Sequence, residues 1–144
     1  MSSLSFLNYV LSGDRPANVP FVWRRSRSDF SWPTLGAIDP VREGLKGVPG
    51  VVVVWSQARH GRYIYVGQSR DLAAAVTMLR SDPAVDAYGA RQLNVTWAPI
   101  GVAHRPGVVA YLRRVLDPAV DRCSLDDRWP VGSAVRPLSV PLPA

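Results

Sequence analysis

The sequence has little of several residue types that carry common protein chemistry. Cys123 is its one cysteine, which excludes an internal disulfide. The chain has two histidines, His60 and His104, so it cannot supply the four nitrogen and sulfur ligands of a structural zinc site. Glu43 is the one glutamate among 11 acidic residues. No apolar run approaches the ~20 residues of a membrane-spanning helix. Disulfide scaffolds, structural zinc modules and membrane spans are therefore excluded.

Lysine is also nearly absent, because 16 of the 17 basic residues are arginines and Lys46 is the exception. The formal net charge of +6 favours polyanions or an acidic partner. Arginine suits bidentate contacts to phosphate, but a G+C-rich coding bias would produce the same excess, so both explanations remain open. Residues 1–10 lack the features of a secretory signal, and we expect a cytoplasmic protein with no membrane contact.

The middle of the chain has regular patterns. The β-branched run Val51–Ser56 and the segment Gly61–Gly67 predict a β-hairpin. Ser69 is the expected N-cap of a helix that ends near Ser81. Leu93–Ile100 predicts a third strand. Pro106 is expected to open a second helix that ends before Pro118. This order predicts an α+β fold with a small three-stranded antiparallel sheet flanked by helices.

The two ends of the chain are rich in proline. Residues 1–48 are predicted to be an irregular arm packed on the core, with a short helical stretch at Val41–Lys46. Aromatic residues alternate with arginines in this arm and could stack on bases or pin the arm to the core, and we expect pinning. Residues 49–123 form the predicted core, and residues 124–144 a Pro-rich extended tail.

Two segments carry a family resemblance. Pro49–Trp55 and Arg62–Leu72 resemble the core of the GIY-YIG nuclease superfamily, over about residues 45–121. Gly50-Val51-Val52 would stand in the first named tripeptide and Tyr65-Val66-Gly67 in the second. The resemblance implies a hairpin, a helix, a third strand and a further helix, which is the order that the periodicity also predicts.

The resemblance further implies phosphodiester hydrolysis by water activated near tyrosines, with an arginine on the first helix and a metal-binding glutamate on a later one. Val52 stands at the position of the first tyrosine, Ala75 at that of the arginine and Val109 at that of the glutamate. None of these side chains can move a proton, stabilise an oxyanion or bind a hard cation. Only Tyr65 is retained, so no catalytic set, metal or cofactor is expected.

The sequence therefore predicts a catalytically inactive GIY-YIG-like binding module that contacts nucleic acid or a nucleoprotein complex through a basic surface. One alternative is a structural subunit of a larger assembly, such as a phage particle or a defence or secretion complex, which contacts proteins through the N-terminal arm or the C-terminal tail. A second alternative is a divergent metal-dependent nuclease. The candidate nucleic-acid-binding residues are Arg59, His60, Arg62, Tyr63, Arg70 and Arg105.

Overall fold

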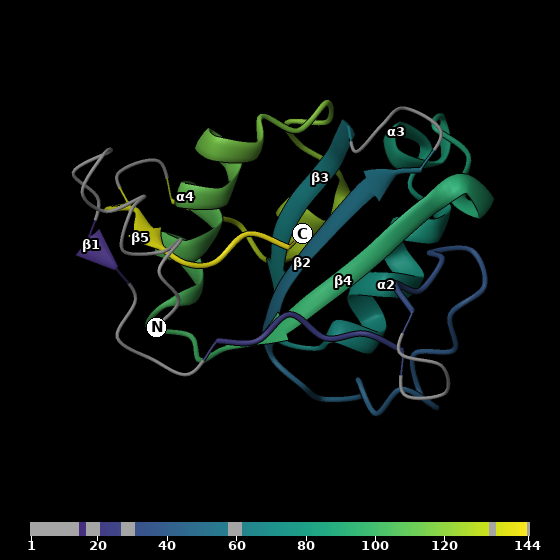
Figure 1. Cartoon of the computed structure of the whole chain (residues 1–144), viewed down its shortest axis with the longest axis horizontal. Helices are drawn as coiled ribbons and strands as arrows, with labels where there is room; N and C mark the ends of the chain where they lie inside the picture. Colours follow the sequence, from purple (N-terminus) through teal and green to yellow (C-terminus); the bar gives the residue numbers. More distant parts are fainter. Residues whose placement is uncertain (1–14, 17–20, 27–30, 58–61, 133–134, 144) are drawn as a thin grey trace.

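A three-stranded antiparallel sheet lies at the centre of the computed structural model, which describes residues 15–16, 21–26, 31–57, 62–132 and 135–143 (Figure 1). Its strands are β2 (Gly50–Ser56), β3 (Arg62–Ser69) and β4 (Leu93–Pro99), in the spatial order β3-β2-β4. Both neighbours of β2 run antiparallel to it. The predicted strands and their antiparallel arrangement are therefore confirmed.

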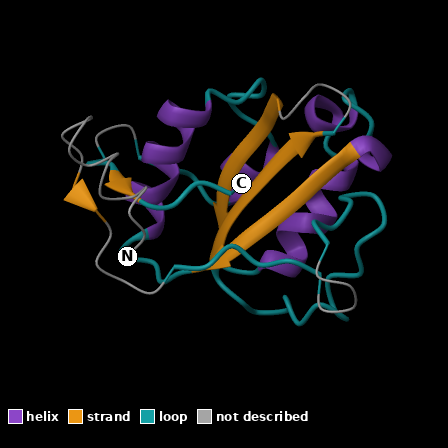
Figure 2. Cartoon of the chain, in the orientation of Figure 1, coloured by secondary structure: helices purple, strands orange, loops and turns teal. Residues whose placement is uncertain are grey.

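Helices and short elements complete the described fold (Figure 2). The helices are α2 (Leu72–Ser81), α3 (Pro83–Asp86), α4 (Arg105–Leu116) and α5 (Ser124–Arg128), with a 3₁₀ turn, η1 (Ala90–Gln92). A second, two-stranded parallel sheet pairs β1 (Arg15–Pro16) with β5 (Leu138–Ser139). The predicted α+β class is confirmed. Among the described residues, none of the helices has the length and apolar character that crossing a bilayer requires.

The two faces of the sheet pack against different parts of the chain. Val52 and Val54 of the central strand face one cluster, which α2, α3 and α5 cover together with residues 35–45. Val51 and Val53 face the other cluster, which α4 and the C-terminal residues cover. Because successive side chains of a strand point to opposite faces, the uninterrupted valine run of β2 reflects burial on both sides.

Both edges of the sheet are covered by other parts of the chain. Backbone N–H groups of Arg24 and Leu35 donate to carbonyls of β4 at 2.9 and 2.8 Å. On the outer edge of β3, Ala119 and Val120 donate to the carbonyls of Tyr63 and Ile64. Covered edges leave few strand groups open for pairing with another chain.

The aromatic residues of the N-terminal arm that the structure describes lie against other parts of the protein. Phe21 and Trp23 pack on the α4 side of the sheet, and the indole N–H of Trp23 donates to the carbonyl of Pro141 at 2.7 Å. The guanidinium of Arg25 lies 4.1 Å from the ring centre of Trp32. Trp23 therefore joins the arm to the C-terminal residues, which cross the sheet near the end of the chain (Figure 1).

Three details differ from the sequence predictions. Asp71, not Ser69, caps α2, because its carboxylate accepts the N–H groups of Ala73 and Ala74, while the Ser69 hydroxyl bonds to the backbone of Asp71. Val41–Lys46 forms turns and no helix. The segment predicted as an extended tail begins with the short helix α5. Asp126 stabilises this helix by accepting the backbone N–H of Cys123 at 3.0 Å.

Candidate functional site

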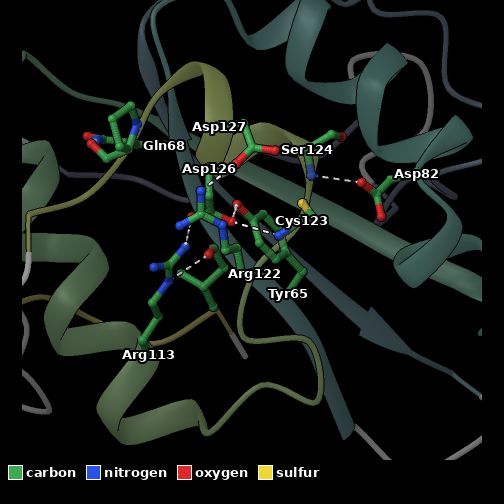
Figure 3. Close-up of polar contacts among 11 residues, drawn as sticks. Tyr65, Gln68, Asp82, Arg113, Arg122, Cys123, Ser124, Asp126 and Asp127 are labelled. Carbon is green, nitrogen blue, oxygen red and sulfur yellow. Dashed lines mark hydrogen bonds and ion pairs between the residues drawn. The ribbon is translucent and has the colours of Figure 1, made fainter.

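Tyr65, the one catalytic candidate that the resemblance leaves, lies inside the protein. The side chain is 1% exposed, and its hydroxyl donates a 2.8 Å hydrogen bond to Oδ2 of Asp126 (Figure 3). Oδ1 of the same carboxylate pairs with the guanidinium of Arg113, which comes from α4. We call Tyr65, Arg113 and Asp126 the Tyr65 cluster. It joins β3, α4 and α5 through one carboxylate.

The surroundings of Tyr65 keep its hydroxyl protonated. Burial is the first cause that raises its pKa, followed by the electrostatic effect of the nearby Cys123, by the negative charge of Asp126 and by the hydrogen bond that the neutral hydroxyl donates to that carboxylate. Arg113 opposes this shift without reversing it. A buried hydroxyl with a raised pKa does not lose its proton near neutral pH, so Tyr65 is poorly suited to act as a general base.

Arg113 and a second carboxylate complete the polar links around Tyr65. Nε of Arg113 donates to the carbonyl of Val66 at 3.0 Å, which satisfies one more group on the edge of β3. Asp82, the N-cap of α3, accepts the backbone N–H of Ser124 at 2.8 Å (Figure 3). Burial alone would raise the pKa of Asp82, but the hydrogen bonds from Ser124, Val85 and Ala84 lower it below its usual value. The described polar side chains thus hold α5 in place.

The other three positions to which the resemblance would assign functional side chains do not form a polar site. Val52 and Ala75 are fully buried in the same cluster as Tyr65. Val109 is fully buried in the cluster on the opposite face of the sheet. The α4 side chain that reaches Tyr65 is Arg113, which the sequence analysis did not single out. Among the described residues, no group of three or more histidine, cysteine, aspartate or glutamate side chains is placed to hold a metal ion.

The predicted nucleic-acid-binding residues occupy two ends of β3. Arg59 and His60 lie outside the described residues. Arg62 is exposed at the first residue of β3, and the hydroxyl of the half-buried Tyr63 donates to the carbonyl of Pro143. Arg70 is exposed just after the last residue of β3, about 26 Å away at the usual strand rise. These basic residues therefore do not form a single site.

Arg105 lies with Arg70 rather than with Arg62. It is the first residue of α4, is 5% exposed, and has a positively charged neighbour in Arg70 that lowers its pKa in addition to the larger effect of burial. The sequence analysis chose Arg105 as a nucleic-acid-binding candidate on a basic surface, and the structure shows that this arginine, unlike Arg62 and Arg70, is largely buried. Its burial depends on how α4 packs, which local sequence does not report.

The comparisons with known proteins add no relative. The chain matches no protein-family model, no curated protein and no solved structure. The GIY-YIG-like character of the chain accordingly stays a prediction that rests on residues 49–55 and 62–72. The geometry of its own side chains is the basis for a proposal about function.

Sequence reasoning missed the partners of Tyr65. Asp126 lies 61 residues from Tyr65 in the chain and Arg113 lies 13 residues from Asp126. One signal was available: Asp126 stands three residues after Cys123, the spacing at which a carboxylate supports a helix start. That signal predicts a local contact to the Cys123 backbone, but it does not predict the contact to Tyr65.

Two buried tyrosines allow a matched test of the Tyr65 cluster. We expect Tyr65→Phe to lower the free energy of unfolding by about 1–2 kcal/mol, because the carboxylate of Asp126 loses a hydrogen bond in a place that water does not reach. Tyr111 is also fully buried, but its hydroxyl has no hydrogen-bond partner among the described residues, so Tyr111→Phe should be neutral or stabilising. Urea unfolding of both variants measures the difference, and equal losses would contradict it.

The pH dependence of the same variants gives a second readout. An unfolded tyrosine ionises near its ordinary pKa of 10.0, whereas Tyr65 in the folded state keeps its proton. The unfolded state therefore loses a proton above this pH that the folded state retains, and stability falls as the pH rises. Tyr65→Phe lacks this contribution, so the stability difference between the wild type and the variant should narrow above pH 10.0. A constant difference would contradict the assignment.

Proposed function

We propose that this protein is a non-catalytic module on a GIY-YIG-like scaffold that binds nucleic acid, alone or in a nucleoprotein complex. The observation that carries the proposal is the state of Tyr65: its hydroxyl is buried and donated to Asp126. On α4, Val109 stands where the resemblance places the metal-binding glutamate, and the α4 side chain that reaches Asp126 beside Tyr65 is the guanidinium of Arg113. The net charge of +6 supports a polyanionic partner.

The exposed arginines at the two ends of β3 are the proposed contact points. Arg62 and Arg70 are both exposed, and neither has an ion pair among the described residues. Their separation of about 26 Å corresponds to about eight base pairs of a duplex. A nucleic acid of that length or longer is needed to reach both ends at once. Short oligonucleotides should therefore bind more weakly than long ones.

The test is a salt titration of nucleic-acid binding. Fluorescence anisotropy with DNA and RNA of about 20 nucleotides, single-stranded and duplex, should show a log–log salt slope close to the number of phosphates contacted. Replacing both Arg62 and Arg70 with glutamine should reduce that slope by about two, one for each lost contact. No binding to any of these nucleic acids at low salt would contradict the proposal.

A charge-matched control separates local contacts from net charge. Arg42 and Arg91 are exposed and lie in the 39–44 turns and in η1, away from β3. Arg42→Gln with Arg91→Gln removes the same total charge as Arg62→Gln with Arg70→Gln. The salt slope of nucleic-acid binding should change less in this control than in the variant with Arg62 and Arg70 replaced. Equal changes would show that Arg62 and Arg70 make no special contact.

The alternative of a divergent nuclease has its own assay. Plasmid DNA and RNA are incubated with the protein and Mg²⁺ or Mn²⁺. Since Tyr65 is protonated and hydrogen-bonded, we expect no cleavage above that of a mock preparation. Metal-dependent cutting that disappears in Tyr65→Phe would overturn the non-catalytic proposal.

The alternative of a structural subunit draws less support from the packing. It needs an arm and a tail that are free to contact other proteins, whereas Trp23 and Leu142 pack on the protein's own sheet. Isolation of the protein from its native source separates the two proposals. Copurifying nucleic acid supports the binding module, and stoichiometric protein neighbours without nucleic acid support the subunit.

A further inference from the structure

Arg105 is almost entirely buried, and its Nε has no hydrogen-bond partner among the described residues. The residue exposes 5% of its surface, and its Nε is buried without a hydrogen bond. Among the described residues, ion pairs join Arg113 to Asp126 and Arg122 to Asp127, and Arg105 takes part in neither. An arginine cannot neutralise itself by losing its proton, so this charge stays in place. A covered charge without a counter-ion is strongly unfavourable.

One further arginine and the start of a helix lie near Arg105 and make its surroundings more favourable for an anion. Arg70 is close enough for its charge to lower the pKa of Arg105, together with burial, which has the larger effect. Arg105 is also the first residue of the 12-residue helix α4, whose N-terminus carries a partial positive charge. Two guanidinium groups and a helix start therefore act in the same region.

The nearest acidic residue in sequence does not neutralise this region. Asp71 follows Arg70 directly, but its Oδ1 accepts the backbone N–H groups of Gly47 and Ala73 at 3.0 and 3.1 Å. It also accepts the N–H of Ala74 at 3.4 Å. These contacts hold its carboxylate at the start of α2. Neither Arg70 nor Arg105 takes part in the ion pairs found among the described residues.

We propose that Arg70 and Arg105 together bind one phosphate group at the start of α4. Guanidinium groups suit phosphate because their N–H groups match the geometry of its oxygens. The identification of that phosphate as part of a nucleic-acid backbone rests on the proposed function. The phosphate chemistry itself does not, since inorganic phosphate presents the same oxygens to the two arginines.

The direct test follows thermal unfolding of the full chain in sodium phosphate and in sodium chloride of equal ionic strength. Phosphate at about ten times its Kd should raise the Tm by about 4 °C over chloride, because it binds only the folded state. Arg105→Met should abolish this rise. It should be no less stable than the wild type in chloride, because it removes an unpaired covered charge and keeps the apolar stem.

Two further variants keep the test decisive. Arg70→Gln alters an exposed residue and should reduce the phosphate-dependent rise even if Arg105→Met fails to fold. Arg91→Gln, on the exposed turn η1, should leave the rise intact. The inference is wrong if the wild type has the same Tm in both salts, or if the variants at positions 70 and 105 keep the full rise.

A binding titration separates this inference from the proposed function. If the bound phosphate belongs to a nucleic-acid backbone, Arg105→Met should weaken nucleic-acid binding and reduce the salt slope by about one. Unchanged nucleic-acid binding together with no phosphate effect on Tm contradicts the phosphate site and leaves the proposed function standing. A phosphate effect without any nucleic-acid binding contradicts the proposed function and supports a site for free phosphate.

Discussion

Asp126→Ala should lower the free energy of unfolding by about 3 kcal/mol, a large loss for the removal of one buried carboxylate. Its two oxygens accept the hydroxyl of Tyr65, the backbone N–H of Cys123 and the guanidinium of Arg113. Removing the carboxylate leaves Tyr65 and the Cys123 N–H buried without partners, and leaves Arg113 without its counter-charge. Urea unfolding of the wild type and the variant measures this loss.

Two comparisons define what the loss means. Asp127→Ala alters the adjacent carboxylate, which pairs with Arg122 on the exposed surface, and should cause no measurable change. Asp126→Ala combined with Tyr65→Phe should cost about as much as Asp126→Ala alone, because both changes remove the same hydrogen bond. Additive losses in the double variant would show that Tyr65 and Asp126 do not act together.

Gly67→Ala should also cost about 3 kcal/mol, at the upper end of what overpacking usually costs. A Cβ at this position would lie 2.3 Å from the hydroxyl oxygen of Tyr65 and 2.6 Å from its Cε2. The ring cannot move away cheaply, because it is buried and its hydroxyl is bonded to Asp126. The variant should therefore unfold at a lower urea concentration than the wild type.

A change of the ring tests the cause of this clash. In a Tyr65→Leu background, which lacks the atoms that the new Cβ would meet, Gly67→Ala should add a much smaller loss. Gly101→Ala serves as the control, since nothing lies within 4 Å of a Cβ there. If Gly67→Ala costs the same with and without the ring, the contact with Tyr65 is not its cause.

Close packing explains why glycine stands at positions 50 and 67, in the two tripeptides that carry the family resemblance. The ring of Tyr65 lies over Gly67, and a Cβ on Gly50 would lie 2.5 Å from the backbone oxygen of Ala98 in the neighbouring strand. Both positions need glycine for close approach, whether or not the protein cuts nucleic acid. A GIY-YIG-like pattern can therefore be maintained in a protein without the catalytic set, which is consistent with the proposed binding module.

Much of the fold could be predicted because its signals are local. The valine run of β2 and the apolar spacing of Leu72, Val76 and Leu79 in α2 follow directly from strand and helix periodicity. The cap of α2 was predicted two residues too early, since Ser69 and Asp71 both suit a helix start and only the backbone path decides between them. Local sequence preferences therefore predict where helices and strands lie more accurately than they predict the residues at which these elements begin and end.

The candidate site was less predictable, because it depends on contacts between distant residues. Tyr65 was selected from its motif, yet its role follows from Asp126, 61 residues away. Arg105 was selected as a basic residue, but nothing in its neighbours indicated that it would be 5% exposed. Charge and residue type are visible in a sequence, whereas burial and pairing are not.

The sequence alone determined the excess of arginine and the order of β2, β3, α2, β4 and α4, and it carries the resemblance in which Val52, Ala75 and Val109 would stand at three functional positions. Only the tertiary structure decided that Tyr65 is a buried donor and that Arg105 is a buried cation whose Nε has no partner among the described residues. The physical reason is that periodicity acts over a few residues, while desolvation and pairing depend on which elements pack together. The chemistry of Tyr65 and Arg105 is therefore set by that packing.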